Sequence, residues 1–205
     1  MRLPLIAAAM LLAVAAPASA QACWGVPPAE GGFAMHAGVV SVDGSTGFAT
    51  RAVLRGPGPL MAGVGYAGHE NELERAVHRW SARVGLDLSG GAGAVCYGVG
   101  YTYATLDGPG TRPQVAVREH RVPATVSAGT VLRLPAGALL VPAVAAGPML
   151  IWSRPDRLAP FHAVALQGGA SLTLAAGPVL ATGGVTINSN SGIPLEWTLG
   201  AGFRL

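Results

Sequence analysis

The stretch 195–205 at the end of the chain alternates between two kinds of side chain. Apolar residues occupy the odd positions and small, polar or charged residues the even ones: Leu195, Trp197, Leu199, Ala201, Phe203 and Leu205 against Glu196, Thr198, Gly200, Gly202 and Arg204. A strand places successive side chains on opposite faces, whereas a helix mixes the two sets around its axis. The stretch therefore predicts a β-strand with one apolar face and one small, polar face.

The same alternation recurs along the chain, in segments 80–89, 94–104, 122–134, 163–174 and 179–188. Four segments follow it less regularly, namely 33–42, 47–55, 59–67 and 138–151. The last of these is apolar on both faces, and its Pro142 and Pro148 cannot donate to a strand ladder, so we expect an irregular strand there. With 195–205 the count is ten predicted strands, and eight is the alternative because the first three segments are the least regular.

Two kinds of connection alternate between these predicted strands. Short connections rich in glycine and proline lie at 56–58, 90–93, 135–137 and 176–178, and more polar, mostly longer ones at 43–45, 68–79, 105–121, 152–160 and 189–194. An up-and-down barrel with tight turns at one rim and long loops at the other has this pattern. An even number of strands leaves both ends of the barrel domain at the rim of the tight turns.

The composition indicates which face of the wall lies outside. Apolar residues make up 51% of the chain and charged residues only 11%, where a soluble domain has roughly 25% charged residues. The small face would be a poorly solvated exterior, but it suits the narrow interior of a barrel whose apolar face meets lipid. Aromatic residues near predicted strand ends fit interfacial girdles, namely Trp80, Tyr101, Tyr103, Trp152, Phe161 and Trp197.

We therefore predict an all-β fold, an up-and-down antiparallel transmembrane β-barrel of ten strands. The alternative is a soluble exported barrel with its bulky face inside, where it would bind an apolar ligand.

Residues 1–20 have the three parts of a signal peptide. Arg2 supplies the positive charge, residues 3–16 the apolar core, and Ala18-Ser19-Ala20 the cleavage site. The core is shorter than the about 20 residues that a membrane-spanning helix needs. A lipid on Cys23 is a weaker alternative, because residues 20–22 lack the large aliphatic residue that begins a lipobox. We expect a periplasmic segment at 21–31 and the barrel domain at 32–205.

The end of the chain resembles the C-terminal β-signal of outer-membrane barrels, which reads polar-x-Gly-x-x-apolar-x-apolar. Its four defined positions are Thr198, Gly200, Phe203 and Leu205, although the commonest bacterial form ends in an aromatic residue. The whole chain resembles the small bacterial outer-membrane β-barrel superfamily in architecture. The resemblance implies insertion into the outer membrane of a Gram-negative envelope by the barrel-assembly machinery. We expect a monomer surrounded by outer-membrane lipid.

The chain has two cysteines, Cys23 and Cys96. An even number in an exported protein predicts a disulfide, and two buried, unpaired thiols are the alternative. Cys96 falls on the small face near the periplasmic end, so a bridge to Cys23 would pin the N-terminal segment across the mouth of the barrel.

If the bulky face meets lipid, a set of charged and titratable side chains points inward: His36, Arg51, Arg55, Arg83, Asp87, Arg133, Glu196 and Arg204. Charges inside a narrow barrel are costly unless they are paired. A closed, salt-bridged interior is the favoured interpretation, because ten strands enclose little more space than the eight that side chains fill. A basic, porin-like constriction that selects anions is the alternative.

Known catalytic and metal-binding patterns do not occur in the sequence. Residues 69–78 hold two histidines and three glutamates, but their spacing matches no metal motif, so we predict a solvated external loop, no metal and no cofactor. GxSxG, Walker and zinc motifs are absent, and His36 and His162 have no serine or acid two residues away; a pairing of His120 with Ser127 stays open. The arginines form no basic stripe, which argues against a nucleic-acid partner.

We predict a non-enzymatic barrel of a structural, interaction or small-solute pore type. A membrane-embedded lipid hydrolase is the low-ranked alternative.

Overall fold

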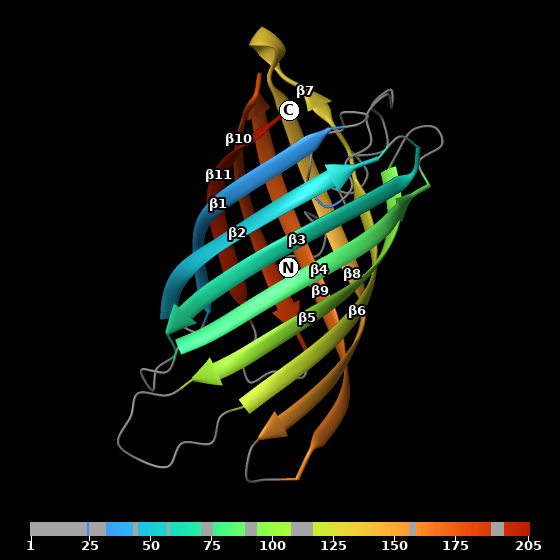
Figure 1. Cartoon of the computed structure of the whole chain (residues 1–205). Coiled ribbons are helices and arrows are strands. Elements are labelled where there is room, and N and C mark those ends of the chain that lie inside the picture. The colour runs from blue at the N-terminus through green and yellow to red at the C-terminus, as the bar shows by residue number, and fades with distance from the viewer. Residues whose placement is uncertain are drawn as a thin grey trace, which may run out of the picture.

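The computed structural model describes residue 24 and the ranges 32–42, 45–56, 58–70, 76–88, 94–107, 117–155, 159–189 and 195–205. Ten long strands form a closed barrel (Figure 1). Their bounds are β1 (Phe33–Val42), β2 (Ser45–Arg55), β3 (Leu60–Glu70), β4 (Ala76–Asp87), β5 (Ala94–Asp107), β6 (Val117–Gly129), β8 (Leu139–Pro155), β9 (Phe161–Ala176), β10 (Val179–Asn188) and β11 (Glu196–Arg204).

Every strand pairs antiparallel with its neighbours in the chain order. The pairs β1–β11 and β6–β8 complete the ring. A two-residue strand, β7 (Leu132–Arg133), and a short 3-10 turn, η2 (Pro135–Gly137), form a hairpin with the start of β8 at the top of Figure 1. Within the described residues no helix is long and apolar enough to cross a membrane.

The predicted number of ten strands is confirmed, and the irregular strand 138–151 is the single 17-residue strand β8. Its ladder with β6 is interrupted between Met149 and Ala146, where Pro148 lies. The ladder between β5 and β6 is interrupted in the same way, next to Pro123. A proline has no N–H to donate, so the ladder skips these positions and resumes beyond them.

One rim carries the tight turns and is called the turn rim below; the opposite rim is the loop rim. At the turn rim, Gly177 and Pro178 join β9 to β10, and Gly177 has φ 57°. Gly58, between β2 and β3, has φ 88°. These left-handed conformations strain residues that carry a Cβ, which explains glycine in these turns.

The strands extend further toward the loop rim than the apolar alternation predicted. Residues 68–79 were predicted to be a loop, but β3 continues to Glu70 and β4 starts at Ala76. The predicted loop 105–121 likewise contains the end of β5 and the start of β6. A ladder needs only backbone groups and continues into polar sequence, so the alternation marked the end of the apolar exterior and not the end of the strands.

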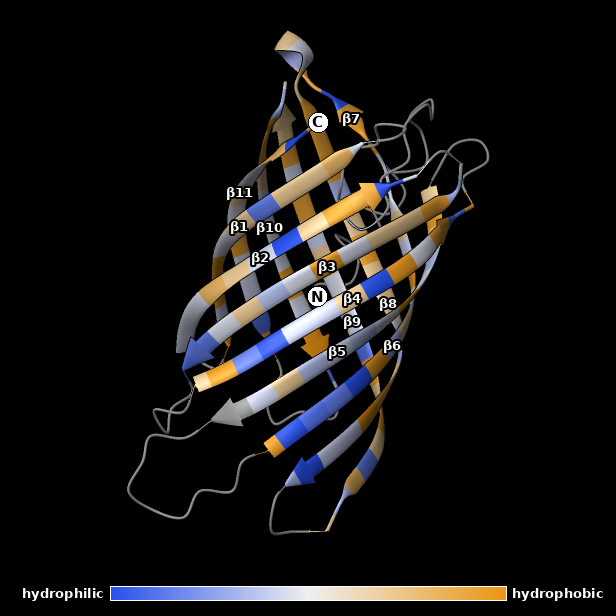
Figure 2. Cartoon of the chain, viewed as in Figure 1, coloured by the Kyte–Doolittle hydropathy of each residue, from blue (hydrophilic) through white to orange (hydrophobic). Residues whose placement is uncertain are grey.

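The two faces of the wall have the predicted orientation. Val64, Val84 and Leu199 point outward and are 60%, 58% and 71% exposed, whereas Val40 and Val141 point inward and are 0% exposed. Hydrophobic and hydrophilic residues follow one another along the strands (Figure 2). A soluble barrel with its bulky face inside has the opposite arrangement, so that alternative is wrong.

The seam between β1 and β11 has glycines on its inner face. Gly38 stands opposite Gly200, and His36 stands opposite Gly202. A Cβ added to Gly200 would lie 2.7 Å from the carbonyl oxygen of Ala37. Cβ atoms essentially never approach other heavy atoms that closely, so the first and last strands can meet this closely only without side chains there.

Candidate functional site: a lumen closed at two levels

Trp24 lies inside the barrel, although it precedes the first strand in the chain. It is 7% exposed and packs in a buried cluster with Val53, Met61, Ala94 and Cys96, which come from β2, β3 and β5. These contacts place the indole in the half of the lumen that is nearer the turn rim. The side chain therefore fills the part of the barrel where an open channel would have to pass.

Three glycines make the room for this indole. Gly85 and Gly98 face each other across β4 and β5, and Gly63 lies on β3. A Cβ on Gly85 would stand 2.5 Å from Cζ2 of Trp24, and a Cβ on Gly98 would stand 3.1 Å from the same atom. Any other residue at Gly85 would occupy space that the ring fills.

Two arginines lie over the same ring. The Cζ atoms of Arg51 and Arg83 are 6.0 and 5.4 Å from the centre of the Trp24 ring. Cations at such distances are attracted to the negative face of an aromatic ring. Trp24 thus fixes the position of two guanidinium groups in the lumen.

A buried ion pair closes the turn rim. Arg55 Nη2 donates to Asp87 Oδ2 at 2.9 Å, and the side chains are 9% and 0% exposed. These residues end β2 and β4. The pair and the Trp24 cluster together fill this end of the barrel.

A second ion pair spans the lumen nearer the loop rim. Arg79 on β4 donates from Nη1 and Nη2 to the two carboxylate oxygens of Glu196 on β11, each at 2.6 Å. Three strands separate β4 from β11 around the ring, so this bidentate contact crosses the interior. Arg121 also donates to Glu119 on the same strand.

A cavity of about 310 Å³ lies along the lumen between Trp24 and the Arg79–Glu196 pair. We call it the chamber. Arg51, Arg83 and His36 line it together with the hydroxyl-bearing residues Ser81, Ser127, Ser171, Thr182, Thr186 and Thr198. His36 Nδ1 is 3.4 Å from Thr182 Oγ1, which is 3.0 Å from Thr173 Oγ1.

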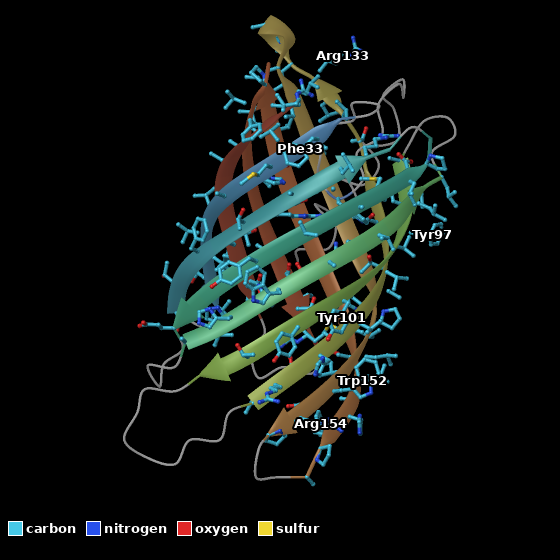
Figure 3. All side chains as sticks on the ribbon, in the orientation of Figure 1. Phe33, Tyr97, Tyr101, Arg133, Trp152 and Arg154 are labelled. Carbon is cyan, nitrogen blue, oxygen red and sulfur yellow. The ribbon has the colours of Figure 1, made fainter. Side chains whose placement is uncertain are left out.

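The structure brings five of the predicted lumen charges into the barrel: Arg51, Arg55, Arg83, Asp87 and Glu196. Arg204 is at the turn rim, where its Nε donates to the Gly177 carbonyl at 2.9 Å. The prediction that Arg133 points into the lumen is wrong, because this residue lies exposed on β7 (Figure 3). Segment 122–134 was predicted as one strand, but β6 ends at Gly129 and Arg133 pairs only with Leu139.

Sequence reasoning missed Trp24 and Arg79. Trp24 is the only aromatic residue in 21–31, and the three inward glycines on adjacent strands were the available signal for a ring beside them. Arg79 fell in a predicted loop, yet it has the same parity as Arg83 and Asp87 on β4. Extending the predicted strand 80–89 by one residue at its start would have placed Arg79 in the lumen.

Cys96 is 1% exposed and packs in the Trp24 cluster. Cys23 lies outside the described residues, so the disulfide stays a prediction. The packing of Trp24 supports it, because residue 23 is adjacent in sequence to a side chain that already contacts this cluster.

His69, His78 and His120 lie on strands, and not in the predicted external loop or in a catalytic pair. His69 and His78 are in β3 and β4, and Tyr66 Oη and His78 Nδ1 are joined at 2.8 Å; residues 71–75 lie outside the described part. Among described residues no group of three potential metal ligands occurs. The pairing of His120 with Ser127 is wrong, because seven positions separate them on β6 and they face opposite sides of the wall.

A row of rings follows one register around the outer face near the loop rim. Tyr66, Trp80, Tyr103, His120 and Trp152 stand directly opposite one another on five adjacent strands, β3 to β6 and β8. The ring centres of Tyr66 and Trp80 are 4.5 Å apart. Figure 3 shows Tyr101 and Trp152 toward this rim and Phe33 toward the other.

Two positions beyond this row, Arg118 and Arg154 face each other across β6 and β8, and both are exposed. At the turn rim, the rings of Phe33 and Phe203 pack 6.3 Å apart. Aromatic residues near both rims, an apolar exterior between them and a small polar interior define a transmembrane β-barrel.

Structural comparison finds similar barrels at low sequence identity. The structure of Ail, the attachment invasion locus protein of Yersinia pestis, is 17% identical with a TM-score of 0.36, and the match covers 86% of this chain and 100% of Ail. Ail in complex with the heparin analogue sucrose octasulfate gives 15% identity, the same coverage and a TM-score of 0.33. A protein from a study of in-meso crystallization of membrane proteins gives 11%, covering 85% of this chain and 83% of that one, with a TM-score of 0.35. No family model and no curated protein matches the chain.

Proposed function

We propose that this chain is a non-enzymatic outer-membrane barrel with a closed lumen, which acts as a structural or interaction protein through its external end. The observation that carries the proposal is the exterior, where large apolar side chains are exposed between the rings at the two rims. In water such an exterior would be a very large exposed apolar surface. In lipid it is the expected one, and arginines such as Arg118 and Arg154 beyond the ring row fit the headgroup region.

Export and assembly are part of the proposal. Residues 1–20 supply the signal for export, and β11 supplies the signal for the barrel-assembly machinery. Phe203 and Leu205 are 43% and 79% exposed on the outer face, while Thr198 and Gly200 line the chamber. A recognition element on the closing strand would present its apolar pair in this way before β1 pairs with it.

The closed lumen favours a structural or interaction role over a pore. Trp24 and the Arg55–Asp87 pair fill one end, and the Arg79–Glu196 pair crosses the other. A small-solute pore is the second candidate, because the chamber between these closures is lined by hydroxyl groups and charges.

Cell fractionation combined with gel mobility tests the proposal. The protein should be found in the outer membrane, and an unheated sample should migrate differently from a boiled one, since closed barrels resist unfolding by detergent. Purified protein should then give no steady conductance in a planar bilayer. Recovery in the soluble periplasm without a mobility shift would contradict the membrane placement, and steady conductance would favour the pore.

A further inference from the structure

Among the described residues, the charges inside the lumen do not balance. Each inward carboxylate among the described residues already has an arginine partner, in the pairs Arg55–Asp87, Arg79–Glu196 and Arg121–Glu119. Arg51 and Arg83 both line the chamber, and neither has a carboxylate partner among the described residues. In this part of the chain two positive charges therefore remain without a carboxylate in a narrow lumen, where an uncompensated charge is costly.

The chamber also has buried polar atoms without a partner among the described residues. Trp24 Nε1, His36 Nε2 and Ser127 Oγ are buried, belong to residues that line the chamber, and have no hydrogen-bond partner among the described residues. When His36 Nδ1 accepts from the Thr182 hydroxyl, the ring proton is on Nε2, which is then a donor. An indole N–H can only donate, and a guanidinium group has no acceptor. The missing partner is a group rich in acceptors.

We propose that the chamber is a binding site for a small oxyanion, of the phosphate or sulfate type, held between Arg51 and Arg83 with Trp24 as its floor. Guanidinium groups bind such oxyanions through two parallel hydrogen bonds. The indole contributes by holding both guanidinium groups over one ring, which reduces the freedom that they lose when the anion binds.

The chamber is large enough for this ligand. Its volume is about 310 Å³, whereas a water molecule takes about 30 Å³ in the liquid, so the chamber has room for a tetrahedral oxyanion together with water. Hydroxyl-bearing residues on three other strands, Ser171, Thr182 and Thr198, also line the chamber and supply further donors to it. The site depends on the barrel fold and not on the structural or interaction role proposed above.

The test uses the full mature chain, folded in a zwitterionic detergent and checked by the mobility shift on boiling. Sodium phosphate and sodium sulfate are titrated by calorimetry and in thermal unfolding at low ionic strength, with sodium chloride at the same ionic strength as the reference. We expect saturable binding of phosphate or sulfate and a rise in the unfolding temperature that chloride does not produce. An equal effect of chloride, or no saturable binding, overturns the proposal while the mobility shift still reports a folded barrel.

The double variant Arg51→Gln/Arg83→Gln should bind phosphate and sulfate at least tenfold more weakly. Without an oxyanion the same variant should unfold at a higher temperature than the wild type, because two unpaired charges have been removed. The matched control is Arg118→Gln/Arg154→Gln, which removes the same charge from the outer face and should bind as the wild type does. Equal loss of binding in both double variants would overturn the proposal.

Ser127→Ala provides a second measure that leaves the charges in place. It removes one donor from the wall of the chamber, and we expect severalfold weaker oxyanion binding with an unchanged mobility shift. Unchanged affinity in both Ser127→Ala and the lumen double variant would place the anion outside the chamber and overturn the proposal.

Discussion

The two ends of the lumen are closed by different means. Near the turn rim, the Trp24 indole packs against three glycines and four buried apolar side chains, and the ion pair beside it has side chains 9% and 0% exposed. Near the loop rim, the closing contact is the Arg79–Glu196 pair, whose side chains are 23% and 20% exposed. The first closure depends on packing and burial, and the second on a partly hydrated contact between charges.

This difference has a consequence for how each end opens. A packed ring leaves only when many contacts break together, whereas water reaches a partly exposed ion pair and screens its charges. The loop rim should therefore open and close more readily than the turn rim. Four predictions test this contrast, beginning with the largest expected effect.

Trp24→Ala should remove the packed closure. Truncating a buried tryptophan typically costs about 3–5 kcal/mol, and here it should also leave the lumen blocked only by ion pairs. We expect a lower denaturant midpoint for unfolding and brief conductance events in planar bilayers where the wild type gives none. Trp197→Ala is the control, because Trp197 is 56% exposed on the outer face. Equal effects of the two truncations would show that the indole does not close the lumen.

Asp87→Asn and Glu196→Gln make the same chemical change at the two ends. Each leaves an arginine without a charged partner, which typically costs about 3–5 kcal/mol in a buried setting. Water screens the partly exposed Arg79–Glu196 pair more than the buried one, which lowers the cost there, although its bidentate contact makes it stronger than an ordinary surface pair. Asp87→Asn should therefore lower the free energy of unfolding clearly more than Glu196→Gln does, as measured by urea titration in lipid vesicles. A reversed order would contradict the assignment of burial to the turn rim.

Reduction of the predicted Cys23–Cys96 disulfide should loosen the turn rim selectively. Closing so long a loop stabilises a fold by up to about 4 kcal/mol in the chain-entropy model. The unfolding midpoint should fall on adding a reductant, and Cys96→Ala should make the protein insensitive to it. A count of two free thiols in the denatured, unreduced protein would disprove the bridge.

Tyr66→Phe should have the smallest effect. It removes one hydrogen bond, to His78 at 2.8 Å, while the ring keeps its contact with Trp80. A hydrogen bond of this kind contributes about 1 kcal/mol, and membrane interface water can replace it. Urea titration should show a loss well below that of Asp87→Asn. A larger loss would mean that the ring row holds the loop rim together and not only positions it in the membrane.

Much of the fold follows from the sequence, because lipid and lumen impose a period of two on every strand. The turns at Gly58 and Gly177 were also predictable, since glycine accepts their positive φ. The strand ends at the loop rim were not, because a ladder runs on through polar residues such as His69 and Arg79. The site was predicted in part: the parity of Arg51, Arg83 and Glu196 indicated an inward direction, but no local pattern tells which of two arginines finds a carboxylate across the lumen.

The position of Arg133 shows a further limit. Its parity within 122–134 indicated the lumen, but β6 ends at Gly129, and the chain then leaves the ring in the hairpin of β7 and η2. The alternation of apolar and polar residues can continue through such a break, so the sequence pattern does not show where one strand ends. A prediction of which face a residue occupies is therefore only as good as the prediction that its strand is continuous.

The outer and inner sides of the seam between β1 and β11 can evolve at different rates. On the outer side, one branched apolar residue can replace another with little loss, because fluid lipid adjusts to its shape. On the inner side, Gly38, Gly200 and Gly202 stand against backbone atoms, and even an added methyl group requires the two strands to separate. Sequences descended from this barrel should therefore differ widely on the outer face and retain these three glycines, so that the seam becomes the part by which distant relatives are recognised.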